Sequence, residues 1–170
     1  MLHTRHRVLW VEGILACIAA AVCVAPAAGR APVGAWNGWA AFADERPRRC
    51  YAIAAPTFAR VPAWASVSSW PGRNRRGEVH FRLTRPARPG SAVIADVDGT
   101  PFALAARGAD AWAATRDGER ALVAAMRRGV LLRVRSRDER GRAFTDGYRL
   151  VGAASAIDAA LIACARQDGR

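Results

Sequence analysis

The sequence predicts a mainly β fold, an antiparallel β-sandwich or barrel-like domain with one internal helix and a C-terminal helix. Short apolar runs recur along the chain and are separated by Pro, Gly and Asp turn signals. Residues 78–84 alternate strictly between apolar and polar side chains, which is typical of a half-buried strand. The dipeptide Asp98-Gly99 lies between two strand-like runs and indicates a tight hairpin. Many short strands joined by such turns favour a sandwich or a closed barrel.

Eight strands and two helices are expected. The internal helix covers residues 116–128 and ends at Gly129, and a terminal helix starts near Ser155. The expected strands cover residues 36–42, 50–55, 63–70, 78–84, 91–97, 100–105, 130–137 and 142–151.

The chain divides into a leader, a linker and one domain. Residues 1–27 are interpreted as a signal peptide, because Arg5 and Arg7 precede an apolar run that ends in an Ala-Pro-Ala cleavage pattern. Residues 28–35 are expected to be a linker, and residues 36–166 a single β-rich domain. This predicts a periplasmic or secreted protein. The alternative is an uncleaved inner-membrane anchor formed by residues 8–28, although Glu12 would be costly in a bilayer.

The cysteines point to one disulfide. Cys17 and Cys23 fall in the signal, which leaves Cys50 and Cys164 as an isolated pair in an exported chain. On the terminal helix Cys164 shares a face with Ile157 and Leu161, so it should point at the core. Two free buried thiols are the competing interpretation. With His80 as the one histidine after the signal, a four-ligand zinc site is excluded, and we expect no metal and no cofactor.

The charge balance is strongly basic. The chain has 26 basic and 14 acidic residues, a formal net charge of +12, and every basic residue is arginine. One interpretation is an anion-binding surface for lipid headgroups or glycans, and the other is a solvated basic surface that reflects coding bias. No nucleic-acid motif is present, so no nucleic-acid partner is expected.

Six tryptophans also have two interpretations. They most simply supply core or edge-covering bulk. The alternative is an aromatic binding platform built from Trp36, Trp39, Trp64 and Trp70.

One segment matches a catalytic motif. Residues 93–100, Val-Ile-Ala-Asp-Val-Asp-Gly-Thr, are similar to the first motif of haloacid-dehalogenase-type phosphotransferases. In that superfamily Asp96 would be the nucleophile and Asp98 the acid and base of a Mg²⁺-dependent aspartyl-phosphate phosphohydrolase. The context is wrong, because strand-like runs precede the motif and residues 101–170 are too few for the remaining α/β units. A strand that ends in a hairpin is favoured, and no catalytic residue is assigned.

The order of features resembles the invasion-associated locus B family of exported bacterial proteins. The resembling segments are residues 39–42, 47–53, 82–83, 96–102, 122–129 and 148–152. The resemblance implies an exported β-sandwich-like domain without an established enzymatic mechanism, and we expect a binding role with an envelope or extracellular partner. Many members carry a further cysteine pair, which this sequence lacks over residues 105–114.

Overall fold

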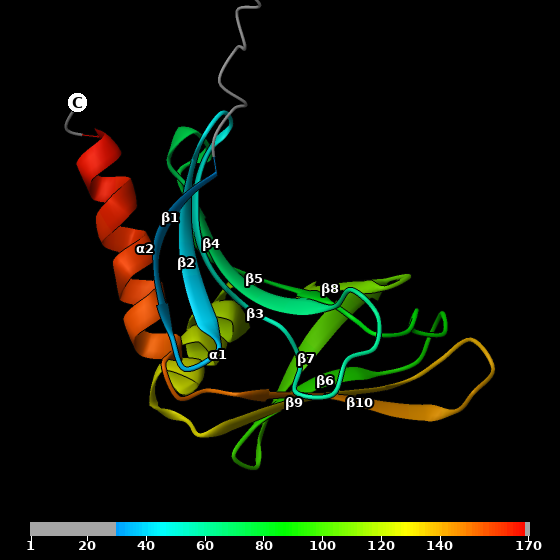
Figure 1. Cartoon of the computed structure of the whole chain (residues 1–170). Coiled ribbons are helices and arrows are strands. Elements are labelled where there is room, and N and C mark those ends of the chain that lie inside the picture. Colours follow the sequence, from blue (N-terminus) through cyan, green and yellow to red (C-terminus); the bar gives the residue numbers. More distant parts are fainter. Residues whose placement is uncertain (1–29, 169–170) are drawn as a thin grey trace, which may run out of the picture.

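The computed structural model describes residues 30–168, which form one continuous antiparallel sheet of ten strands and two α-helices (Figure 1). The prediction of a mainly β fold with an internal and a C-terminal helix is confirmed. The strands are β1 (Arg30–Trp36), β2 (Trp39–Glu45), β3 (Arg48–Ala54), β4 (Trp64–Trp70), β5 (Arg75–Arg82), β6 (Val93–Val97), β7 (Thr100–Arg107), β8 (Asp110–Ala113), β9 (Leu131–Arg137) and β10 (Ala143–Arg149). The helices are α1 (Arg116–Arg128) and α2 (Ala153–Asp168), and one 3₁₀ turn covers Pro71–Arg73.

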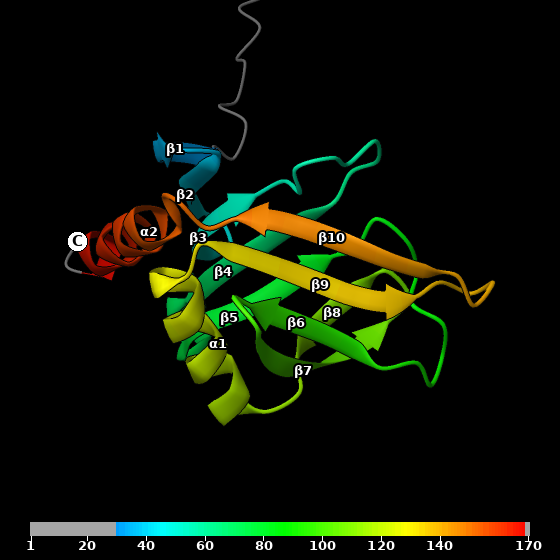
Figure 2. The same ribbon diagram turned by 90° about the horizontal axis from the view of Figure 1, so that it is seen from below.

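The sheet is open but curls back on itself. Its strand order is β1-β2-β3-β4-β5-β8-β7-β6-β9-β10, so the β5–β8 pair joins an N-terminal half to a C-terminal half. The ring of Tyr148 on β10 lies 6.2 Å from that of Phe81 on β5, and Trp39 Nε1 donates to the carbonyl of Arg149 over 2.8 Å. Figure 2 shows β9 and β10 crossing the strands of the N-terminal half. The architecture is therefore barrel-like and made from one sheet, with no second sheet among residues 30–168 to form a two-sheet sandwich.

Two hairpins have two-residue turns in which an Asp or Asn with positive φ is followed by a glycine. Asp98 and Gly99 have φ values of 48° and 92° between the paired residues Val97 and Thr100, which confirms the predicted hairpin. Asn37 and Gly38, at 46° and 90°, form the equivalent turn between β1 and β2.

That second turn corrects two expectations at the start of the domain. It divides the expected strand over residues 36–42, and the expected linker over residues 28–35 carries β1 from Arg30 onward. The alternation signal is weak here because β1 is an exposed edge strand with small side chains and Pro32 at an irregularity in its register. The four-residue strand β8 was also not expected, since it is too short to show a period.

Helix α1 has the predicted bounds. Its N-cap is Thr115, whose hydroxyl accepts from the amide of Gly118 over 3.0 Å. It ends at Gly129, whose φ of −79° is accessible to any residue. Glycine is required there for space, because a Cβ would lie 2.6 Å from Val97 Cγ1.

Helix α2 begins at Ala153, before the expected cap at Ser155. The preceding Gly152 has a φ of +93°, and a Cβ on it would lie 2.2 Å from the carbonyl oxygen of Trp36. A close approach between the β1–β2 hairpin and the start of the helix therefore sets this boundary, rather than a side-chain cap.

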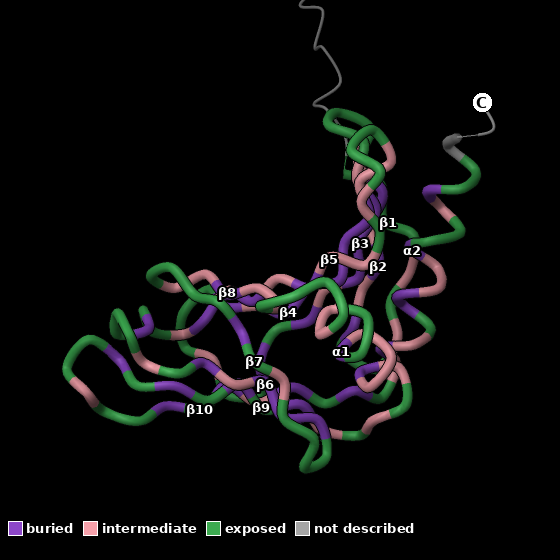
Figure 3. The backbone as a smooth tube through the Cα atoms, turned by 180° about the vertical axis from the view of Figure 1, so that it is seen from behind, coloured by how far each residue is buried: buried purple, intermediate pink, exposed green. Residues whose placement is uncertain are grey.

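The core lies inside the curl of the sheet and beneath the two helices (Figure 3). Leu122 and Met126 of α1 are fully buried in it. Under α2 a second, smaller cluster consists of Ala41, Ala43, Cys50, Ala160 and Cys164. Its small side chains let α2 pack closely on β2 and β3, and within it the predicted Cys50–Cys164 disulfide is formed, with the Cα atoms 5.7 Å apart.

The expected signal peptide over residues 1–27 and the alternative anchor over residues 8–28 lie outside the described residues. Within residues 30–168 no helix is both long and apolar enough to cross a bilayer.

Candidate functional site

A groove of about 810 Å³ opens between α1, α2 and the ends of β3, β4 and β5; we call it the helix-end groove. This volume lies within the range of small-molecule sites. Figures 1 and 2 show the two helices beside each other at one end of the molecule, against the N-terminal half of the sheet. The residues that line it are Arg48, Cys50, Val67, Ser69, Pro71, Gly72, Asn74, Arg75, Arg76, Gly77, Glu119, Arg120, Val123, Ala124, Arg127, Ile157, Ala160, Leu161, Cys164 and Ala165.

The floor of the groove is apolar. Val67, Ile157 and Ala160 are buried there beside the Cys50–Cys164 disulfide. Because the disulfide joins β3 to α2 directly at this point, it fixes the distance between the floor and the helical wall. A covalent bond here holds the groove in shape without a ligand.

The rim of the groove is basic. Its lining contains five arginines and one carboxylate, Glu119. Glu119 Oε1 accepts from the amide of Val79 over 3.2 Å and lies 4.0 Å from Arg75 Nη2, so it ties α1 to β5. Arg127 Nη1 lies 2.7 Å from Asp158 Oδ1 and links the two helices. Arg75 and Arg120 also pair with Glu78 and Asp117. An anionic group at the mouth would therefore meet guanidinium groups, three of which already contact carboxylates, around an apolar interior.

The sequence predicts which residues of α2 share the face that lines this groove, but it predicts neither the groove nor its other side. Ile157, Leu161 and Cys164, expected on one helix face, all line it, although Leu161 is 38% exposed and does not enter the core. The opposite wall comes from Val123 and Ala124 of α1. The sequence contains no signal that these two helices lie side by side.

A second cluster of functional interest occupies the opposite end of the molecule. Three loops meet there, over residues 55–63, 83–92 and 138–142, and we call this region the loop end (Figure 2). Thr57 donates its amide to the carbonyl of Gly147 over 2.9 Å, and Arg88 donates its amide to that of Arg137 over 2.9 Å. The carboxylate of Asp146 accepts from both the amide and the hydroxyl of Thr84.

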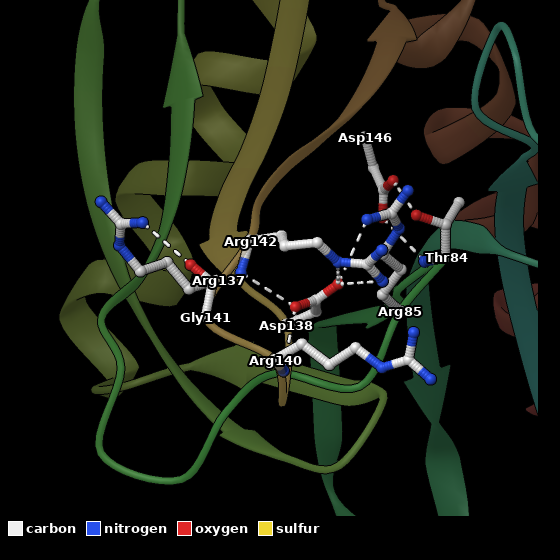
Figure 4. Close-up of polar contacts among 8 residues, drawn as sticks. All are labelled: Thr84, Arg85, Arg137, Asp138, Arg140, Gly141, Arg142 and Asp146. Carbon is white, nitrogen blue, oxygen red and sulfur yellow. Dashed lines mark hydrogen bonds and ion pairs between the residues drawn. The ribbon is translucent and has the colours of Figure 1, made fainter.

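Asp138 organises the arginines of the loop end (Figure 4). Its carboxylate accepts from the backbone amides of Arg140 and Arg142 at 3.0 Å each, and it pairs with the guanidinium groups of Arg142 and Arg85 at 2.9 Å and 3.2 Å. Desolvation alone would raise the pKa of Asp138, but the hydrogen bonds and the charge from Arg142, with the Arg140 amide, outweigh it and lower the pKa. Asp138 is thus a structural carboxylate that stays ionised.

Residues 93–100, which match the phosphotransferase motif, lie in the β6–β7 hairpin. Asp98 Oδ2 accepts from the amide of Val130 at 2.8 Å and Asp98 Oδ1 from that of Leu131 at 3.0 Å, so this carboxylate joins the hairpin to the start of β9. Asp96 accepts from the amide of Gly99 at 3.2 Å and pairs with Arg135 at 3.1 Å. Both carboxylates make structural contacts, in an antiparallel hairpin instead of the parallel strand-to-helix context that the phosphotransferases use.

His80 lies on β5 as an outward-facing strand residue. Its Nε2 is 2.9 Å from Asp110 Oδ1, its ring stacks on Trp112 at 5.0 Å, and Trp64 packs edge-on against it. Asp110 also pairs with Arg82 at 2.6 Å. This partly buried set holds β5 and β8 together.

The suggested tryptophan platform is not assembled. Trp39 is 1% exposed, and Trp64 and Trp70 lie at opposite ends of β4. Over residues 30–168 no group of three or more His, Cys, Asp or Glu side chains is arranged to hold a metal ion.

Comparison with known proteins gives a structural match. No protein-family profile matches the chain, and no curated protein sequence matches it either. A solved structure described as invasion associated protein B from Bartonella henselae superposes with a TM-score of 0.58 and 16% sequence identity, covering 81% of this chain and 98% of that one. The resemblance drawn from the sequence is thus confirmed at the level of the fold: the chain has the fold of invasion associated protein B.

Proposed function

We propose that this chain is an exported, non-enzymatic envelope protein that binds an anionic amphiphile, a molecule with one alkyl chain and an acidic headgroup, in the helix-end groove. The observation that carries the proposal is the combination of an apolar floor with a rim of five arginines and one glutamate. The expected signal over residues 1–27 supports export, and the disulfide suits an oxidising compartment.

The groove fits an amphiphile better than a fully polar anion. Val67, Val123, Ile157 and Leu161 offer no hydrogen bond, so a polar ligand placed on them would lose its hydration without replacement. Guanidinium groups bind carboxylate and phosphate oxygens through paired hydrogen bonds. An alkyl chain on the floor with its acidic group at the rim satisfies both parts.

The test is a calorimetric titration of the chain from Ala28 onward, which contains every element described, with dodecyl phosphate below its micelle concentration. We expect saturable binding with a negative heat-capacity change, because apolar surface is buried. Dodecanol and butyl phosphate, which each lack one half of the amphiphile, should bind at least about tenfold more weakly.

A matched pair of variants locates the binding. Ala165→Trp adds bulk to an exposed groove-lining position of α2, and Ala121→Trp adds the same bulk to an exposed position of α1 outside the groove. Ala165→Trp should abolish saturable binding and Ala121→Trp should leave it unchanged. If both variants bind like the wild type, or if butyl phosphate binds as tightly as dodecyl phosphate, the proposal is wrong.

A further inference from the structure

The loop end exposes an apolar tip among arginines. Phe58 is 94% exposed and Val61 48% exposed, with Arg60 between them in the sequence. The large hydrophobic side chains elsewhere on the described surface are at most 65% exposed. An almost fully exposed Phe and a half-exposed Val three residues further along give this loop a small apolar tip.

Two arginines, Arg60 and Arg85, lie beside this tip. Loop 55–63 lines a hollow of about 300 Å³ together with Arg85 and the β10 residues Thr145 and Asp146. The side chains of Arg85 and Arg142 are 46% and 59% exposed although both pair with Asp138. The arginines of the loop end and of the adjoining end of β9, all exposed, are Arg60, Arg85, Arg88, Arg137, Arg140 and Arg142.

Most of the carboxylates at the loop end are buried and hydrogen-bonded within the protein. Asp138 and Asp146 are 5% and 3% exposed, and their oxygens face Arg142 and Thr84. Glu139 is exposed beside them. The backbone amide of Arg140 donates to Asp138, but Figure 4 shows the guanidinium group of Arg140 directed away from this carboxylate. The outer surface of the loop end is therefore cationic with an apolar tip.

From this combination we infer that the loop end docks on the surface of a bilayer rich in anionic lipids, with Phe58 and Val61 inserted at the headgroup boundary and the arginines on the headgroups. Interfacial membrane binding requires these two contributions, buried apolar area and attraction of cations to acidic lipids. A soluble polyanion would engage the arginines and leave Phe58 in water, so the apolar tip favours the bilayer. The inference does not depend on the ligand of the helix-end groove, which lies at the other end of the molecule (Figure 2).

The test is cosedimentation of the chain from Ala28 onward with vesicles of phosphatidylcholine that contain ~30 mol% phosphatidylglycerol, which gives them an anionic surface. We expect binding to these vesicles and none to pure phosphatidylcholine. Phe58→Ser should weaken binding about tenfold, and Arg140→Gln about fivefold. Neither change removes a contact that supports the fold, since both side chains are exposed.

The net charge of the whole chain makes matched controls necessary, because any basic protein is attracted to anionic vesicles. Ile162→Ser and Arg116→Gln make the same kinds of change at exposed positions on α2 and α1. These variants should bind within about twofold of the wild type.

Four outcomes would overturn the inference. An equal loss in Arg116→Gln would mean that binding follows net charge alone, and an equal loss in Ile162→Ser would mean that the apolar contribution is not specific to the loop end. If Phe58→Ser left vesicle binding intact, and Arg140→Gln weakened retention on a heparin column as much as it weakened vesicle binding, the surface would be a polyanion site. If Phe58→Ser converted a dimer into a monomer in sedimentation equilibrium, the tip would contact a second copy of the chain.

Discussion

The helix end and the loop end carry the same two kinds of side chain in opposite geometry. In the helix-end groove, apolar residues form a concave floor and arginines stand around it. At the loop end Phe58 is 94% exposed, Arg60 and Arg85 lie beside it, and the other arginines of the loops are exposed. A large groove with buried apolar residues can enclose one small molecule, whereas an apolar side chain exposed at a loop tip needs an extended surface as its partner. Composition alone therefore does not distinguish a ligand site from a docking surface, whereas the burial of the apolar residues does.

The two ends also differ in what holds them. The helix end is fixed by a disulfide that spans 114 residues of sequence and by the Arg127–Asp158 pair. The loop end depends on hydrogen bonds to the carboxylates of Asp138 and Asp146. Only the helix end has a covalent link, which is insensitive to pH, in addition to its ion pair, so the two ends should respond to different perturbations.

Removing the disulfide should have the largest effect. The double variant Cys50→Ser, Cys164→Ser should lose about 2–5 kcal/mol of unfolding free energy, because the unfolded chain is no longer cross-linked. Urea denaturation measures this, and wild-type protein reduced with dithiothreitol should show the same midpoint. Dodecyl phosphate binding should weaken while vesicle binding persists. An unchanged midpoint, or a loss of vesicle binding alone, would contradict the assignment of the disulfide to the helix end.

Crowding at the end of α1 should have the next largest effect. In Gly129→Ala the new Cβ would lie 2.6 Å from Val97 Cγ1, 2.9 Å from Asp98 Oδ2 and 3.0 Å from the carbonyl of Ala125, so we expect a loss of about 1–3 kcal/mol. Gly147→Ala at the loop end is the control, since its Cβ would meet nothing within 4 Å. Thermal unfolding compares the two. Equal melting temperatures for both variants would show that the β6–β7 hairpin does not pack against this helix end as described.

Asp138→Asn should give a smaller, pH-dependent loss of stability. Because the pKa of Asp138 is lowered by folding, the ionised carboxylate stabilises the folded state above its unfolded pKa, near 3.8, and that stabilisation is lost as pH falls through the folded value. The difference in stability between wild type and variant should thus be constant near neutral pH and shrink below about pH 5.

Asp117→Asn is the matched control for this profile, because the Asp117 side chain is 85% exposed on α1. It should show little difference from wild type at any pH. A wild-type advantage over Asp138→Asn that grew as pH fell would have the wrong sign and would refute the account of the loop end.

Phe58→Ala should have the smallest effect on stability. A side chain that is 94% exposed contributes almost no burial, so the change should stay within about 0.5 kcal/mol. The same truncation at Phe81, which is 0% exposed, should cost about 3–5 kcal/mol. Urea denaturation of both variants gives the comparison. A large loss at Phe58 would show that this side chain belongs to the fold and is not free to contact a partner.

Much of the fold could be predicted from local signals. The Asp98-Gly99 hairpin, the bounds of α1 and the pairing of Cys50 with Cys164 follow from turn chemistry, helical period and cysteine arithmetic. The Asn37-Gly38 turn has the same signal, but it lies within an expected strand over residues 36–42, so β1 was not predicted. The boundary at Gly152 depends on contact with Trp36, more than a hundred residues away in the sequence, so no local rule could locate it.

The sites were less accessible to sequence reasoning. The helix-end groove brings together β3, β4, β5, α1 and α2, and its rim combines Arg48, Arg76 and Arg127 from distant parts of the chain. The excess of arginine is compatible with an anionic partner and with a solvated basic surface, and it does not indicate which arginines lie close together. Residues Asp96–Gly99 illustrate the converse, because a segment that matches a catalytic motif forms the hairpin that the sequence favours, and its carboxylates contact β9. In both cases the role of a residue depends on which residues lie near it in the folded chain.

The most direct test of the two-ended account is a crossed measurement on two variants. Dodecyl phosphate titration and sedimentation with vesicles containing phosphatidylglycerol are each performed on Ala165→Trp and on Phe58→Ser. The account predicts that Ala165→Trp loses amphiphile binding and keeps vesicle binding, and that Phe58→Ser shows the reverse. If each variant weakens both kinds of binding to the same extent, the groove and the loop end are not separate sites.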